Sequence, residues 1–298
     1  GYQALSGTDT GTNNKNIAIG NYAMDANLAG AVNNVAVGHE ALSAVTTADN
    51  NTAIGYQALN SAATSQNNTA VGYLALEELT FNGNSYNTAV GVESGKELTT
   101  GIKNTFIGGF AGQSSTDLDL AVLIGYGAGD SVLTSDADGT VGIGAFAAST
   151  ITSGIGNTAV GFEALKAEDD GDFSTAIGYQ ALVAQTGTTG AVNNTAVGYK
   201  ALDGILTGTA NVAVGANALG AADGAENENV GIGYNAGINL NNGSNNIAIG
   251  SNSTFSTAAA SNQVVIGKDA VGQANNSVTL GNADVTAVYM AQDSGATV

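Results

Sequence analysis

The sequence predicts an all-β fold, a parallel β-roll or β-solenoid of about sixteen turns with roughly 17 residues in each. A motif of a β-branched residue, a spacer, an aliphatic residue and a glycine recurs sixteen times. Its glycines follow one another at intervals of 17 to 20 residues, with 14 before the last. A short, fixed period indicates one supersecondary unit stacked on itself. The motif glycines are Gly20, Gly38, Gly55, Gly72, Gly91, Gly108, Gly125, Gly144, Gly161, Gly178, Gly198, Gly215, Gly233, Gly250, Gly267 and Gly281.

Each motif predicts a short strand that ends at its glycine. The residue three positions before the glycine is β-branched, and the residue directly before it is Ile, Val or Leu. These two residues are two apart, so their side chains point to the same face of a strand. The residue between them is usually Ala, as at Ala53 and Ala70. We expect the β-branched pair to be buried, and the small residues to face outward where neighbouring chains pack.

The rest of the repeat predicts bends and a loop. The motif glycine indicates a bend or a close backbone approach. An Asn four residues before the glycine occurs in eleven repeats, for example Asn34 and Asn51. Asn accepts left-handed backbone geometry and bonds its own backbone, so we expect this Asn at a turn. An Ala and a Leu follow the glycine, as in Ala58 and Leu59, and the remaining variable polar stretch predicts a loop.

Composition argues against several classes of partner. The chain has 298 residues, 43 of them Gly, with neither Pro nor Cys, and six basic residues against 25 acidic ones give a net charge of −19. Such a surface repels nucleic acid and anionic membranes. No apolar run approaches the ~18 residues of a membrane helix, so we expect no membrane insertion. The chain opens with Gly-Tyr-Gln-Ala-Leu (Gly1–Leu5), the second half of a repeat, and we expect it to be a piece of a longer protein.

The aromatic residues after the glycine suggest structural stacking. His39, the single histidine, occupies the position that Tyr56 and Tyr73 hold in other repeats, so we interpret it as an aromatic variant and not as a catalytic base. The same column favours stacking along the roll over a sugar-binding ladder. Part of each repeat fits the hexapeptide of left-handed β-helix acyltransferases, which we keep as a remote alternative because the rest does not fit.

Two acidic loops and one threonine column are the other candidate sites. The loops Glu168–Asp172 and Asp136–Gly139 lack the ligand spacing of known calcium loops, and we interpret them as solvated. The threonine column resembles ice-binding solenoids, but Val and Ile replace Thr at the same position, so we expect it to be buried. It includes Thr52, Thr69, Thr88 and Thr105. We therefore predict that the chain is not an enzyme and has no catalytic, cofactor-binding or metal-binding residue; the receptor-binding residues stay unassigned.

The repeat also carries a family likeness over essentially the whole chain. Asn-Thr-Ala-Val-Gly-Tyr, as in Asn194–Tyr199, resembles the head repeat of trimeric autotransporter adhesins, the YadA-like left-handed parallel β-roll. The loops here are two to five residues longer than in that family, and this longer form is similar to the shafts of phage tail fibres. The stretch Asn276–Val288 is similar to the segment that precedes a self-cleaving C-terminal trimerisation chaperone in such fibres.

The resemblance implies an intertwined homotrimer that attaches to a host. We expect residues 1–281 to form the shaft of a fibre, most simply a phage tail fibre on a virion, and residues 282–298 to begin a C-terminal neck segment with a strand over Val285–Met290. The alternative is the head or stalk of a bacterial trimeric surface adhesin or extracellular appendage. The expected partners are further copies of the chain and a host cell-surface receptor, with glycans among the candidates. We expect receptor contact through variable loops or through a tip that is not part of this chain. The least repeat-like loops are Thr80–Tyr86, Thr134–Thr140 and Glu168–Phe173.

Overall fold

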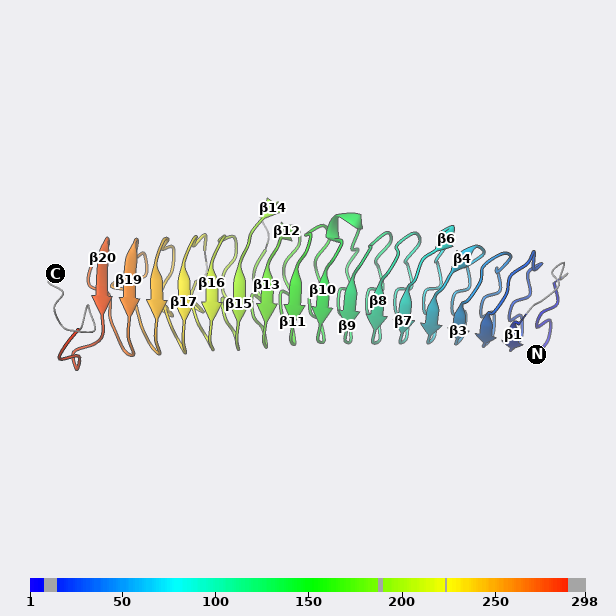
Figure 1. Ribbon diagram of the computed structural model, residues 1–298, viewed down its shortest axis with the longest axis horizontal. Helices are drawn as coiled ribbons and strands as arrows, with labels where there is room; N and C mark the ends of the chain where they lie inside the picture. The colour runs from blue at the N-terminus through cyan, green and yellow to red at the C-terminus, as the bar shows by residue number, and fades with distance from the viewer. Residues whose placement is uncertain (8–14, 187–189, 223, 289–298) are drawn as a thin grey trace. The chain divides into compact units, whose positions relative to one another are not determined.

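The computed structural model is an all-β parallel solenoid, as the sequence predicts. It describes residues 1–7, 15–186, 190–222 and 224–288. The chain makes about 15 turns of roughly 17 residues, and each turn contributes one short strand to a parallel sheet (Figure 1). Within the described ranges, the only helical residues are the three of a 3-10 turn, η1 (Ser135–Ala137).

The strands fall into two compact units, Gly1–Ser174 with Thr186–Ala191, and Thr175–Gln185 with Val192–Val298. Neighbouring strands within each unit pair in parallel and in register, so that Thr52 lies opposite Thr69 and Ile54 opposite Val71. The main strands of the first unit are β1 (Ile17–Ile19), β2 (Val35–Val37), β3 (Thr52–Ile54), β5 (Thr69–Val71), β7 (Thr88–Val90), β8 (Thr105–Ile107), β9 (Val122–Ile124), β10 (Val141–Ile143) and β11 (Thr158–Val160). Those of the second unit are β13 (Thr175–Ile177), β15 (Thr195–Val197), β16 (Val212–Val214), β17 (Val230–Ile232), β18 (Ile247–Ile249), β19 (Gln263–Ile266) and β20 (Ser277–Leu280).

The core lies inside the tube of a single chain, and this corrects the expected orientation of the strands. The middle residue of each three-residue strand points inward, and Ala53 and Ala70 are fully buried there. Ala58 and Leu59, from the turn after the strand, are also fully buried. A circuit of about 17 residues is narrow, so a large residue from one wall leaves room for only a small one from the other. The prediction that Ala faces outward toward a neighbouring chain is therefore wrong.

One of the strands without the usual middle Ala shows how the filled volume of the core is maintained. Phe106 replaces the usual Ala of the strand and is fully buried. The turn positions beside it, which hold Leu in many repeats, are Gly95 and Gly112, and a Cβ atom on either would lie 2.6 or 2.9 Å from the Phe106 ring. Leu59 and Leu76 hold the equivalent position with φ of 50° and 49°, close to the 60° of Gly95. A large strand residue thus takes the place of a large turn residue.

The motif glycines form a column in which only glycine fits. Gly55 has a φ of 142°, a region that side chains rarely adopt. A Cβ atom there would lie 2.1 Å from the carbonyl oxygen of Gly72, and a Cβ atom on Gly72 would lie 2.0 Å from that of Gly91. The close backbone approach predicted from the sequence is therefore confirmed.

The recurring Asn forms a ladder that is stacked, as the sequence predicts, but is buried, and the left-handed geometry is not its own. The side-chain Oδ1 of Asn51 accepts a hydrogen bond from the backbone N–H of Asn68 at 2.9 Å, and its Nδ2 donates to the carbonyl of Ser65 at 2.8 Å. The left-handed backbone belongs to the preceding residue, for example Asn50 with a φ of 60°. The buried members of this column are Asn34, Asn51, Asn68, Asn87, Asn104 and Asn157 in the first unit and Asn194, Asn211, Asn229 and Asn246 in the second.

The C-terminal part departs from the predicted strand. The last strand, β20, ends at Leu280, one residue before the last motif glycine. Residues Val285–Val288, at the start of the strand predicted over Val285–Met290, are not in a strand. The rest of that prediction, and most of the predicted neck segment, lies outside the described residues.

Candidate functional site

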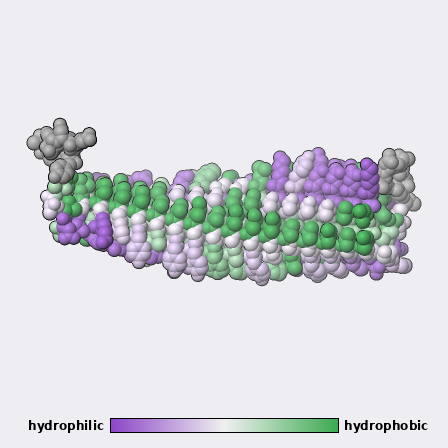
Figure 2. Space-filling model, turned by 60° about the horizontal axis from the view of Figure 1, so that its bottom comes forward, coloured by the Kyte–Doolittle hydropathy of each residue, from purple (hydrophilic) through white to green (hydrophobic). Residues whose placement is uncertain are grey.

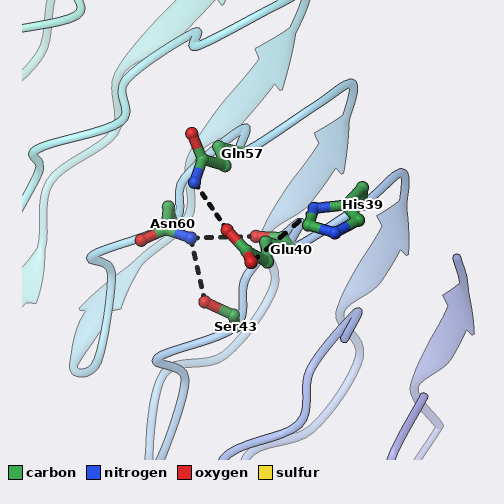
Figure 3. A network of polar contacts seen from close by, with 5 residues as sticks. All are labelled: His39, Glu40, Ser43, Gln57 and Asn60. Atoms are coloured by element: carbon green, nitrogen blue, oxygen red, sulfur yellow. Dashed lines mark hydrogen bonds and ion pairs between the residues drawn. The ribbon is translucent and has the colours of Figure 1, made fainter. Parts of the chain in front are cut away.

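The single histidine belongs to a polar network that joins consecutive turns (Figure 3). The His39 Nδ1 lies 3.7 Å from the Glu40 carboxylate and, among the described residues, has no hydrogen-bond partner. Gln57 of the next turn donates to the Glu40 carboxylate at 2.5 Å. Asn60 donates to the Glu40 carbonyl at 3.2 Å and to the Ser43 hydroxyl at 2.9 Å. Ser43 is thus engaged with Asn60, and the network links one turn to the next.

The aromatic column stacks along the solenoid. His39 and Tyr56 are parallel, with ring centroids 5.4 Å apart, and Tyr56 and Tyr73 are parallel at 5.3 Å. Tyr179 and Tyr199 in the second unit repeat this geometry at 5.5 Å. Other aromatic pairs meet edge to face, as Tyr22 with His39 at 5.7 Å and Tyr126 with Phe146 at 5.5 Å. Aromatic rings thus contact one another between successive turns, in parallel at some turns and edge to face at others, and the preference for a structural stack over a sugar-binding ladder stays a prediction.

The three loops predicted to be exceptional hold the elements that break the repeat. Loop Thr80–Tyr86 contains β6 (Gly83–Asn84), which pairs with β4 (Ser65–Gln66). Loop Thr134–Thr140 contains η1. Loop Glu168–Phe173 contains β12 (Gly171–Asp172), which pairs with β14 (Gly190–Ala191). These loops are therefore raised from the regular outline of the turn.

Two of these loops border open grooves in the first unit that several Asp residues line. One groove has a volume of about 280 Å³ and is lined by Asp136, Ser153, Ile155, Asp170, Asp172 and Gly190. It thus brings together loops Thr134–Thr140 and Glu168–Phe173, which the sequence could not show. A second groove of about 650 Å³ shares Asp170 and is lined also by Thr150, Thr152, Ala167, Asp169 and Thr186.

The acidic side chains of these loops are engaged with the backbone. Glu168 is fully buried, and its carboxylate accepts hydrogen bonds from the N–H groups of Asp169 and Gly171 at 3.0 and 2.8 Å. Asp172 accepts one from the N–H of Ile155 at 2.9 Å. The prediction of a solvated loop fits Asp169, which is exposed, but is wrong for Glu168, whose carboxylate satisfies the N–H groups of a tight turn.

Carboxylates also meet around Asp138. Burial raises the pKa of the Asp138 carboxyl above its ordinary value. The N–H of Asp119 donates to this carboxylate at 2.8 Å and opposes the shift, and the carboxylates of Asp119, Asp117 and Asp136 add to it. Ionised Asp138 therefore carries a cost to folding. Over the part of the chain that the structure describes, no group of three or more His, Cys, Asp or Glu residues is placed to hold a metal ion.

The outer face of the main sheet is uncharged and exposed. It consists of the side chains that flank the buried middle residue of each main strand, and these are Thr, Val, Ile or Leu at every position. Thr52 is partly exposed and Ile54 is 40% exposed. The prediction that the threonine column is buried is therefore wrong: Val and Ile share its position because all three fit a half-exposed, pleated surface. The period of this face could be predicted from the sequence, but the side of the strand on which it lies could not.

None of the helices in the described ranges is long and apolar enough to span a membrane. A scan against models of protein families and a search of curated proteins both give no match to this chain.

Proposed function

We propose that this chain is the structural shaft of a homotrimeric fibre that attaches to a host cell surface, most simply a phage tail fibre. The observation that carries the proposal is the repetition itself: one turn, with the same glycine column, core alanine and outer face, recurs along both units. Repetition of this kind supplies length and stiffness, because each turn contacts only its neighbours. The likeness of the repeat to adhesin heads and tail-fibre shafts supports the same role.

In this proposal the exceptional loops make the contact with the host. Loops Thr80–Tyr86, Thr134–Thr140 and Glu168–Phe173 are the places where the chain departs from the repeat, and binding residues concentrate on loops that a rigid scaffold positions. The strong negative charge of the chain disfavours an anionic receptor. The repeat also fits the shaft of a bacterial trimeric adhesin, which is the second candidate.

Loop exchange tests the proposal. Each of the three loops is replaced by the corresponding segment of a regular 17-residue turn, and particle attachment to host cells is measured. The control is the same exchange at residues 46–49, in a regular loop. We expect attachment to fall for at least one of the three loops and to be unchanged for the control. Unchanged attachment for all four folded variants would show that the loops do not contact the host. Labelling with a gold-conjugated antibody against the chain, on virions and on bacterial cell surfaces, distinguishes a phage fibre from a bacterial adhesin.

A further inference from the structure

We propose that the outer face of the main sheet is the surface through which copies of this chain bind one another. This inference rests on the proposed homotrimeric fibre and names the surface that would assemble it. It replaces the alanine positions, which the structure places inside each chain.

The face is uncharged, mostly aliphatic and at least partly exposed, and it is continuous from strand to strand within each unit. The exposed residues directly before the glycines include Ile19, Ile54, Val90, Ile107, Ile177, Val214, Ile232, Ile266 and Leu280. In-register pairing aligns them in rows, as Val35 with Thr52 and Val37 with Ile54. Figure 2 shows rows of hydrophobic side chains crossing successive turns on the side that it presents. Contiguous apolar patches of this kind mark interaction sites on proteins.

The lack of charge on the face and its regular period both fit another copy of the chain as the occupant. The chain carries a net charge of −19, so two copies repel one another wherever their acidic loops approach. The outer face has no charged residue at any of its positions, and like-charged copies can approach closely there. Because every copy carries the same aligned columns at the same period, a symmetric arrangement places like turns against like turns.

The side chains of the face also suit burial. Val, Ile and Thr are stiff at χ1, so they lose little rotamer freedom when a partner covers them. Their hydroxyl and methyl groups form a flat, pleated surface on three-residue strands such as β3 and β8. The acidic grooves are formed by loops elsewhere in the turn, so assembly through this face leaves them open to a receptor.

Introducing positive charges at the face tests the inference. The variant Ile54→Lys with Ile107→Lys places like charges on two exposed positions of the face. The matched control is Leu120→Lys, which also replaces an exposed apolar side chain, in the left-handed position that Lys103 holds one turn earlier. Sedimentation equilibrium gives the mass, and circular dichroism confirms that each variant stays folded. We expect the unchanged chain and the control to be trimers, and the double variant to have one third of their mass.

Cross-linking decides the case if the double variant fails to fold. Since the chain has no cysteine, Thr52→Cys and Ile54→Cys each introduce a single one at the face, and Asn82→Cys does so in an exposed loop. Oxidation should yield disulfide-linked dimers from at least one of the first two and none from the third.

The outcomes show whether this inference fails alone or together with the proposed function. A double variant that keeps the trimer mass, or an absence of cross-linking at both Thr52 and Ile54 in a trimer, overturns the face and leaves the fibre proposal standing. A monomeric unchanged chain overturns both. A monomer that also gives thermal hysteresis in freezing solution would identify the threonine-containing face as an ice-binding surface.

Discussion

The Asn ladder predicts a large, local loss of stability from a single small substitution. Asn51 is fully buried, and its side chain makes three hydrogen bonds, one to the Ser65 carbonyl and two with Asn68, while its own N–H donates to Asn34 of the preceding turn. Asn51→Ala removes the three side-chain bonds and leaves the N–H of Asn68 and the carbonyl of Ser65 without their partner. A typical hydrogen bond contributes about 1 kcal/mol, and a buried orphan group costs about 1–3 kcal/mol. We therefore expect a loss of roughly 2–4 kcal/mol.

The assay must separate a local defect from global unfolding. Urea denaturation of the full chain measures the free energy of unfolding, and hydrogen exchange measures protection of the Asn68 amide. Solenoids need not unfold in two states, so the two readings are taken together. The control is Asn82→Ala, which removes an exposed side chain and should change stability by less than about 0.5 kcal/mol.

Asn51→Asp provides a second reading of the same site. It keeps an acceptor for the Asn68 amide but turns an oxygen toward the Ser65 carbonyl, where the native Nδ2 donates at 2.8 Å. We expect it to destabilise the chain at neutral pH, because a buried carboxylate faces an acceptor. If Asn51→Ala behaves like Asn82→Ala in both measurements, the ladder does not stabilise the solenoid and the reasoning is refuted.

Three further predictions follow from the core and the acidic loops. Gly55→Ala should prevent folding or cost more than about 3 kcal/mol in urea denaturation, because its Cβ meets backbone, whereas Gly30→Ala, with open space around it, should cost clearly less. Phe106→Ala should cost about 3–5 kcal/mol, and adding Gly95→Leu should recover part of this loss by restoring the Ala and Leu pairing of other turns; a purely additive double variant would contradict the exchange of volume. The pKa of Asp138 is raised in the folded chain, so its stability penalty at neutral pH disappears as pH falls through that pKa. Asp138→Asn should therefore raise the melting temperature at neutral pH and not in acid, and an equal gain at both would exclude ionisation as the cause.

The sequence predicted the period and class of this fold because both follow from local patterns. A strand before each glycine, a backbone contact at the glycine and a polar loop after Leu59 all appear where the repeat placed them. Two of the three exceptional loops, Thr80–Tyr86 and Thr134–Thr140, lie in 19-residue turns, and both carry extra elements. Glu168–Phe173 lies in a 17-residue turn, and its short strand pairs with one in the 20-residue turn that follows. The period of the repeat and the positions of lengthened turns can thus be identified from one sequence without an alignment.

The direction of the strand faces could not be read in the same way. Alternation shows that Ala53 and Ile54 lie on opposite faces, but either face of a short strand can be the core. The narrow cross-section of the turn decides which face is the core, because only a small residue such as Ala53 fits inside beside Leu59, and Ile54 lies outside. The partners of Asn51 and Glu168 were missed for a related reason, because they depend on contacts between successive turns and on the geometry of a tight loop.

Electron cryomicroscopy of the assembled chain, at a resolution that shows side chains, tests the central claim most directly. The account predicts three chains in each cross-section, with Ala53 inside its own chain and the columns of Thr52 and Ile54 turned toward the common axis. A single chain whose outer face is open to solvent, or an assembly whose copies meet through another surface, would contradict it.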